Sequence, residues 1–93
     1  MDKIHHKELA DGSMEIDFSD RPLKIDGTDV KKLVMREPDV DDQIIAKSAS
    51  DGDPAEAEIA IIANLTELPP EQVRKFKIRQ YTRLQAAYQD FLF

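Results

Sequence analysis

The segment at residues 53–70, DPAEAEIAIIANLTELPP, constrains the fold of this chain more than any other stretch. Asp53 can cap free backbone N–H groups, and Pro54 suits the first helical position, where its missing N–H costs nothing. Glu56 stands three residues after the cap, where its side chain can reach back in a capping box. Residues 59–63 are apolar on nearly every side, and two prolines then end the helix. Because a helix that is apolar all round is usually buried, the sequence predicts a central buried helix.

Length and composition limit the class of protein. The 93 residues make one small domain with a modest core. The chain has no cysteine, which excludes disulfides, thiolate metal sites and a thiol nucleophile. Its longest apolar run, residues 59–63, is far shorter than the roughly 20 residues needed to cross a bilayer, and no apolar signal-peptide core begins the chain. We therefore expect a soluble intracellular protein with no membrane partner.

Charge is divided unevenly along the chain. Residues 1–72 contain 8 Lys and Arg against 18 Asp and Glu, whereas residues 73–93 contain 5 against 1. An acidic body disfavours nonspecific nucleic-acid binding, because phosphates repel it. The basic segment at residues 74–79 either meets an acidic partner or is a solvated helix flank that complements the acidic body within the fold.

The N-terminal residues 1–13 show no sustained periodicity and end in a turn signal, Asp-Gly-Ser. We expect a flexible arm there, followed by a single domain over residues 14–93. The only histidines, His5 and His6, lie in this arm. Glu8 and Asp11 would complete only a poor, exposed ligand set, so no metal site is expected.

A β-hairpin is predicted after the arm, because apolar and polar residues alternate on both sides of a turn signal. The predicted segments are residues 14–18 and 23–25 for the first strand, residues 26–27 (Asp-Gly) for the turn, and residues 30–36 for the second strand. Pro22 implies a bulge, an edge or a bend in the first strand. The second strand has an ambiguous register, and Lys31-Lys32 is the candidate for a bulge there. A lone hairpin is marginally stable in water, so one face must pack on helices.

A helix is predicted over residues 40–49, before the central one. Asp39 is its expected N-cap, and Asp41-Asp42 suit the positive end of the helix dipole. A calcium site at this acidic trio is disfavoured, because calcium loops alternate their ligands around a glycine. One face of this helix carries Val40, Ile44 and Ile45, joined by Ser48.

Two further helices are predicted after the paired prolines, a short one around residues 70–73 and a long one over about residues 79–91. Phe76 and Ile78, at their junction, are the expected anchors into the core. The long helix has a stripe at helical spacing, which core packing explains by default; its members are Tyr81, Leu84, Ala87, Tyr88 and Phe91. The two tyrosine hydroxyls need a partner or solvent, which places them at the margin of the core.

The sequence therefore predicts an α+β fold, in which an N-terminal β-hairpin packs on a small bundle of three to four helices with a central buried helix. No catalytic constellation is present, because both histidines lie in the expected arm and the three glycines are isolated turn residues that cannot cradle a phosphate. An enzyme is the least favoured class.

The order of several short motifs resembles that of the tail assembly chaperones of Mu-like and related contractile-tailed phages. The resemblance is carried by PLKIDG at residues 22–27 with Val30 and Leu33, REP at residues 36–38, IAIIANLT at residues 59–66, LPPE at residues 68–71 and YTRLQ at residues 81–85. It covers residues 14–92. The basic run at residues 74–79 departs from the family, in which a more acidic linker is expected.

This resemblance implies a non-enzymatic chaperone of phage tail morphogenesis that needs no cofactor. Such a protein is expected to bind the tape measure protein and to keep it soluble until tail tube subunits polymerise around it, with the tail tube protein as a further partner. It implies action in the host bacterial cytoplasm, on behalf of a phage or prophage, and absence from the mature virion.

Two other functions remain open. One is an acidic adaptor or inhibitor that binds a basic protein partner. The other is a helix-turn-helix nucleic-acid binder formed by residues 70–83, which the acidic body disfavours.

The charge asymmetry and the apolar C-terminal end suggest a partner surface on the last helix. Its candidate residues are Arg74, Lys77, Arg79, Tyr88 and Phe93. Leu92 and Phe93 either dock on the core or belong to an interaction surface. Self-association is also open, because a hairpin edge or the C-terminal aromatics could pair two chains.

Overall fold

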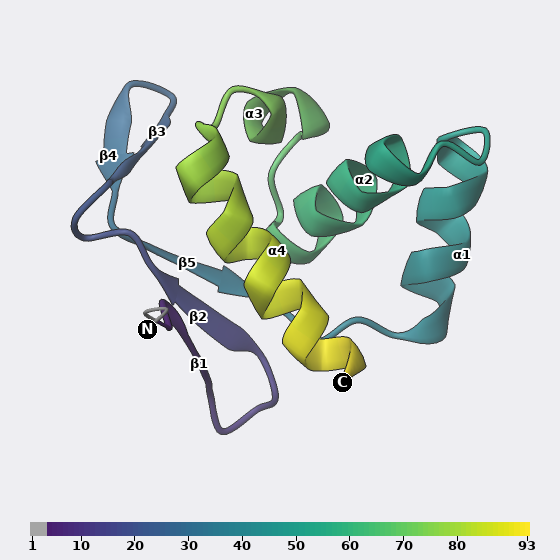
Figure 1. The fold of residues 1–93 in the computed structure, drawn as a ribbon, viewed down its shortest axis with the longest axis horizontal. Coiled ribbons are helices and arrows are strands. Elements are labelled where there is room, and N and C mark those ends of the chain that lie inside the picture. The colour runs from purple at the N-terminus through teal and green to yellow at the C-terminus, as the bar shows by residue number, and fades with distance from the viewer. Residues whose placement is uncertain (1–3) are drawn as a thin grey trace.

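The structure, a computed structural model, describes residues 4–93, and over that range antiparallel strands are followed by four helices. The strands are β1 (His6–Glu8), β2 (Met14–Asp17), β3 (Leu23–Ile25), β4 (Thr28–Val30) and β5 (Lys32–Met35). The helices are α1 (Val40–Ala49), α2 (Pro54–Thr66), α3 (Pro70–Arg74) and α4 (Ile78–Leu92). In Figure 1 the strands lie on one side, α4 runs across the front of the molecule, and α1 lies at the opposite edge. The predicted α+β class is confirmed.

The predicted hairpin exists, but it is divided between two sheets. β2 pairs antiparallel with β5, with Met14 opposite Met35, and β3 pairs with β4, with Leu23 opposite Val30. Between these two ladders, residues 18–22 of the first strand face Lys31 alone, whose carbonyl accepts from the Phe18 N–H at 2.6 Å.

The extra residues therefore lie on the first strand, at the bend expected from Pro22. The bulge predicted at Lys31-Lys32 of the second strand is wrong. The extra residues belong to the first strand, and the second strand supplies only Lys31 opposite them. The turn at residues 26–27 is confirmed: Asp26 and Gly27 have φ of 51° and 78°, the left-handed values that an Asp-Gly hairpin turn requires.

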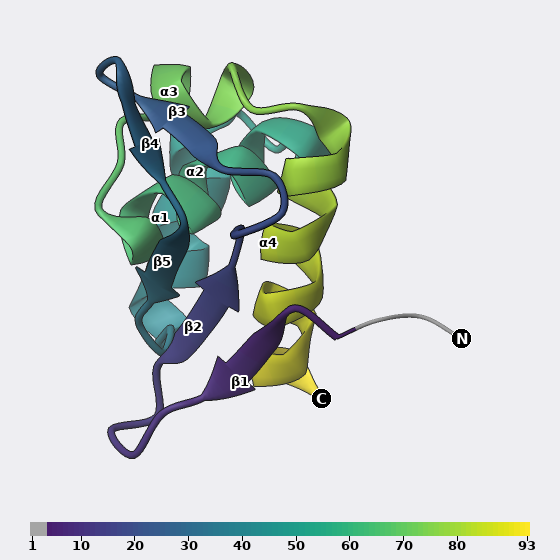
Figure 2. The same cartoon turned by 90° about the vertical axis from the view of Figure 1, so that its left-hand side faces the viewer.

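Strand β1 lies within the segment where the sequence predicted a flexible arm. It pairs antiparallel with β2, with His6 opposite Ile16, and completes the three-stranded sheet β1-β2-β5 (Figure 2). The His6 ring also hydrogen-bonds the carboxylate of Asp90 on α4. The strand has only three residues and none of them is buried, which explains why periodicity did not reveal it. Residues 1–3 of the expected arm lie outside the described residues.

Helix α2 occupies the centre of the fold, as predicted. Its second half is buried, including Ile61, Ile62 and Leu65, and α1, α3, α4 and β5 all contact it. Asp53 caps the helix by accepting from the N–H groups of residues 55 and 56. The expected return contact from the Glu56 side chain is wrong, because that carboxylate pairs with Arg74 of α3 instead.

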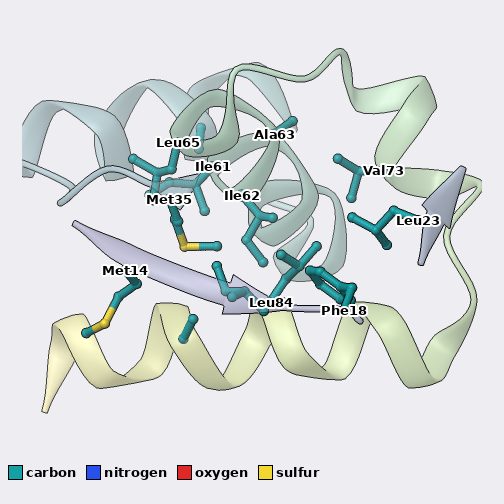
Figure 3. Packing of buried hydrophobic residues seen from close by; sticks show 13 residues of the cluster. Met14, Phe18, Leu23, Met35, Ile61, Ile62, Ala63, Leu65, Val73 and Leu84 are labelled. Carbon is teal, nitrogen blue, oxygen red and sulfur yellow. The ribbon is translucent and has the colours of Figure 1, made fainter. Parts of the chain in front are cut away.

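The core lies where the β2–β5 face meets α2 and α4. Figure 3 shows Leu84 of α4 and Ile62 of α2 converging on Phe18 and Met35. Of the stripe predicted on α4, Leu84 and Ala87 are buried, and the aromatic members are half-buried against the same cluster. The predicted packing of this helix is confirmed.

Candidate partner-binding surface

The five residues predicted to bind a partner do not form one patch. Arg74, Lys77 and Arg79 lie at the α3–α4 junction, whereas Tyr88 and Phe93 lie at the opposite end of α4 (Figure 1). Helix α4 has 15 residues, so its ends are about 20 Å apart at a rise of 1.5 Å per residue. The molecule therefore has two separate candidate surfaces on this helix.

The basic surface is built around an exposed apolar residue. Lys75, Lys77 and Arg79 are exposed, and Ile78 among them is 74% exposed. The expectation that Ile78 anchors in the core is wrong. Phe76, the other expected anchor, does pack against the core. Ile78 is the first residue of α4 and lies about a third of a turn away from Leu84 around the helix, so it faces outward while Leu84 is buried.

An open groove lies beside Ile78. Its volume is about 290 Å³, and its walls are mostly apolar. The lining residues are Ile59, Val73, Arg74, Phe76, Ile78 and Tyr81. The Tyr81 hydroxyl donates to Glu58 at 2.8 Å, and burial together with this carboxylate raises the pKa of Tyr81. The one cation that lines the groove, Arg74, is ion-paired with Glu56. We call this groove, defined by the six residues above, the α3–α4 groove.

The other end of α4 borders a second groove, of about 420 Å³, between α1, α2 and α4. Ala46, Pro54, Ala57, Ile61 and Tyr88 supply its apolar walls. The Tyr88 hydroxyl accepts from the amide of Gln43 at 3.1 Å, which confirms its predicted place at the margin of the core. We call this the three-helix groove.

Leu92 and Phe93 extend the apolar character of this end of α4. They are 44% and 100% exposed, so they do not dock on the core. Leu92 lies one turn beyond Tyr88 and therefore on the same side of the helix as the three-helix groove.

Helix α1 carries a third exposed surface. Its bounds and its Asp39 cap are as predicted, but the apolar residues predicted on one face are exposed: Val40 by 74%, Ile44 by 57% and Ile45 by 63%. The residues that α1 buries are Asp42 and Ala46. The periodicity correctly placed these residues on one face of the helix. It could not show whether another element covers that face.

Asp42 holds α1 in this orientation, and its role was not predicted beyond the helix dipole. Its carboxylate accepts from both terminal nitrogens of Arg36, at 2.8 and 2.9 Å, and from the Asn64 amide of α2 at 3.1 Å. It also completes a capping box with Asp39. The Arg36 guanidinium, with the Asp39 N–H, holds the pKa of Asp42 well below its usual range. The Asp-x-x-Asp spacing at the helix start was the available signal.

Arg83 is the second functional side chain that the sequence did not single out. It is 9% exposed, and its guanidinium donates to both carboxylate oxygens of Asp20 and to the Asp17 carbonyl. This bidentate pair lowers the pKa of Asp20 and raises that of Arg83. One of the five cations in residues 73–93 is thus held inside the fold, and it is unavailable to a recognition helix.

The described part of the chain contains no group of three His, Asp or Glu residues that could hold a metal ion. Among residues 4–93, no helix combines the length and apolar character that crossing a membrane requires. What the surfaces offer is apolar side chains and grooves with charged borders, which is the chemistry of protein–protein recognition.

Comparison with known proteins adds the family. The model of one protein family, described as phage tail assembly chaperone proteins, E, or 41 or 14, matches residues 19–92. No curated protein and no solved structure matches the chain. The matched region includes both grooves and the exposed face of α1, and it contains all the motifs that carried the resemblance, which lie between residues 22 and 85. This chain belongs to the phage tail assembly chaperone family.

Proposed function

We propose that this chaperone binds the tape measure protein during phage tail assembly. It keeps that protein soluble in the host bacterial cytoplasm until tail tube subunits polymerise around it, and it is absent from the mature virion. The membership of residues 19–92 in the tail assembly chaperone family is the observation that carries this proposal. It is a binding function, without catalysis or a cofactor.

The three-helix groove is the proposed place of contact. Its apolar walls and the neighbouring Leu92 and Phe93 form a surface that suits the apolar stripe of an amphipathic helix. Gln43, Lys47 and Glu58 at its border supply polar groups that can fix the orientation of such a helix. Of the residues predicted from the sequence, Tyr88 and Phe93 thus belong to this contact.

Co-expression with the tape measure protein of the same genome tests the function. The expected result is that the tape measure protein is soluble only with the chaperone and co-purifies with it. An insoluble tape measure protein without a recoverable complex would refute the proposal.

A second comparison tests the place of contact. The double variant Leu92→Lys with Phe93→Lys should weaken co-purification strongly at an unchanged melting temperature, because both side chains are exposed. Val34→Lys is the matched control, since Val34 is also exposed but lies on the sheet. Equal co-purification by both variants would place the contact elsewhere on the chaperone.

A further inference from the structure

The last turn of α4 carries an acidic residue at a place where the helix itself disfavours one. Asp90 is the only Asp or Glu among residues 73–93, and it stands two residues before the end of α4 at Leu92. The C-terminal end of a helix has a partial negative charge, which repels a carboxylate and favours a cation. No basic residue is present in this turn. The helix dipole therefore does not explain Asp90, and a partner outside the helix does.

His6 of β1 is that partner. Its ring nitrogen hydrogen-bonds the Asp90 carboxylate, 84 positions away in the chain, and its side chain is 9% exposed. The pairing of β1 with β2 holds the ring there, because His6 lies opposite Ile16 and the Asp17 N–H donates to the His5 carbonyl at 2.7 Å. In Figure 2, β1 lies beside the C-terminal end of α4. A strand of three residues thus reaches the last turn of α4.

Asp90 and Tyr88 tie down opposite sides of this turn. They are two residues apart, which corresponds to about 200° around a helix. The Tyr88 hydroxyl accepts from Gln43 of α1, and Asp90 binds His6 of β1. No other side chain of residues 88–93 forms a hydrogen bond to another described element. The end of α4 is therefore held between α1 and β1.

The exposed residues at the end of α4 depend on this turn for their position. Leu92 ends the helix and Phe93 follows it, and neither is covered by the core. Helix ends open locally at little cost in free energy unless other elements tie them down. Loss of the contact on the β1 side would leave only Tyr88 and the half-buried Phe91 to hold the turn.

We propose that His6 and Asp90 form a clasp, by which β1 fixes the last turn of α4 and so positions Leu92 and Phe93 for the tape measure protein. His6 is a positioning residue, because it acts through Asp90. The positioning rests on the proposed function, whereas the clasp itself does not. The family match begins at residue 19, so the half of the clasp on β1 lies outside the matched region.

Hydrogen exchange followed by mass spectrometry on the whole chain tests the clasp. His6→Ala removes the ring and keeps the β1 backbone, so amide exchange in residues 89–93 should become at least about threefold faster, with α2 unchanged. His5→Ala is the matched control, since His5 is the same residue type one position earlier and its side chain points to the other face of the strand. It should exchange like the wild type at the end of α4.

Exchanging the two partners tests the contact itself. His6→Asp places two carboxylates against each other, and Asp90→His places two imidazoles there, so each single variant should loosen the last turn. The chain with both substitutions restores a histidine–carboxylate pair and should return to near wild-type exchange. If either residue acted independently of the other, the double variant would be at least as loose as the single ones.

Co-purification with the tape measure protein tests the positioning. His6→Ala and His6→Asp should recover at least about threefold less tape measure protein than the wild type, because Leu92 and Phe93 are no longer held in place. The His6→Asp, Asp90→His double variant should recover the wild-type amount. Circular dichroism of each variant verifies that it is folded.

Three results separate the possible failures. Unchanged exchange at residues 89–93 in His6→Ala would overturn the clasp. Faster exchange with unchanged co-purification, while the double variant Leu92→Lys with Phe93→Lys loses its partner, would overturn the positioning. If the wild type itself recovers no tape measure protein, the proposed function and the positioning fall together, and the exchange measurement alone decides the clasp.

Discussion

The guanidinium of Arg83 forms a two-point contact with the carboxylate of Asp20, with both nitrogen–oxygen distances at 2.8 Å. The pair joins α4 to the bend between β2 and β3, 63 positions earlier in the chain. The same guanidinium lies 5.7 Å from the centre of the Phe18 ring. It thereby fixes α4, and with it both candidate grooves, relative to the sheet.

Replacing Arg83 with methionine should lower the free energy of unfolding by about 1–3 kcal/mol, because three charge-assisted hydrogen bonds are lost while side-chain volume is largely kept. Urea denaturation followed by circular dichroism measures the change. Arg79→Met on the same helix is the control, and it should stay within about 0.5 kcal/mol of wild type because Arg79 is exposed. Equal effects would mean that the Asp20 pair contributes nothing specific.

Asp42 is predicted to be the most important acidic residue for the docking of α1. Asp42→Ala removes the contacts to Arg36 and Asn64 and half of the capping box, so unfolding should become easier by about 2–3 kcal/mol. Asp41→Ala, one residue earlier and exposed, should cost less than about 1 kcal/mol through the helix dipole. A larger loss at Asp41 than at Asp42 would contradict the role given to the buried carboxylate.

The free energy of unfolding should decrease in acid, because the carboxyl groups of Asp20 and Asp42 both have lowered pKa values in the folded protein. Hydrogen bonds from Arg83 and from Arg36 hold the pKa values of Asp20 and Asp42 below their usual value of 3.8. The unfolded chain therefore binds more protons than the folded one as the pH falls through 3.8, so this stabilisation is complete above that value and decreases below it.

Unfolding free energies between about pH 6 and pH 2 measure this dependence. The double variant Asp20→Asn with Asp42→Asn should show a smaller decrease across this interval than the wild type, although it starts from a lower stability. Parallel pH profiles would refute the assignment of the acid sensitivity to these two groups.

Glycine should be favoured at position 27 because of the left-handed backbone conformation there, and not because a side chain would lack space. Its φ is 78°, and no atom lies within 4 Å of the position that a Cβ would take. Gly27→Ala should therefore cost about 1 kcal/mol through backbone strain without a steric clash. Gly27→Asn should cost less, because asparagine tolerates the left-handed region. Thermal denaturation of the two variants checks the order, and a more stable alanine variant would contradict it.

The sequence by itself determined the local structure. Asp39, Asp53 and the paired prolines set the helix boundaries, and Asp-Gly set the hairpin turn, because capping, proline geometry and positive φ act over a few neighbouring residues. The repeated apolar spacing of α4 likewise placed Leu84 in the core. The order of these elements was enough to indicate the family.

Only the tertiary structure decided which apolar residues are covered and which charges are inside. Ile45 and Ile78 are exposed, although isoleucine is usually a core residue. Asp42 and Arg83 are buried, although aspartate and arginine usually lie on the surface. Their burial depends on partners supplied by distant elements, such as Asn64 for Asp42 and Asp20 for Arg83. A helical period shows that a helix has an apolar face, but coverage of that face depends on how distant segments pack in space, and no local pattern contains that information.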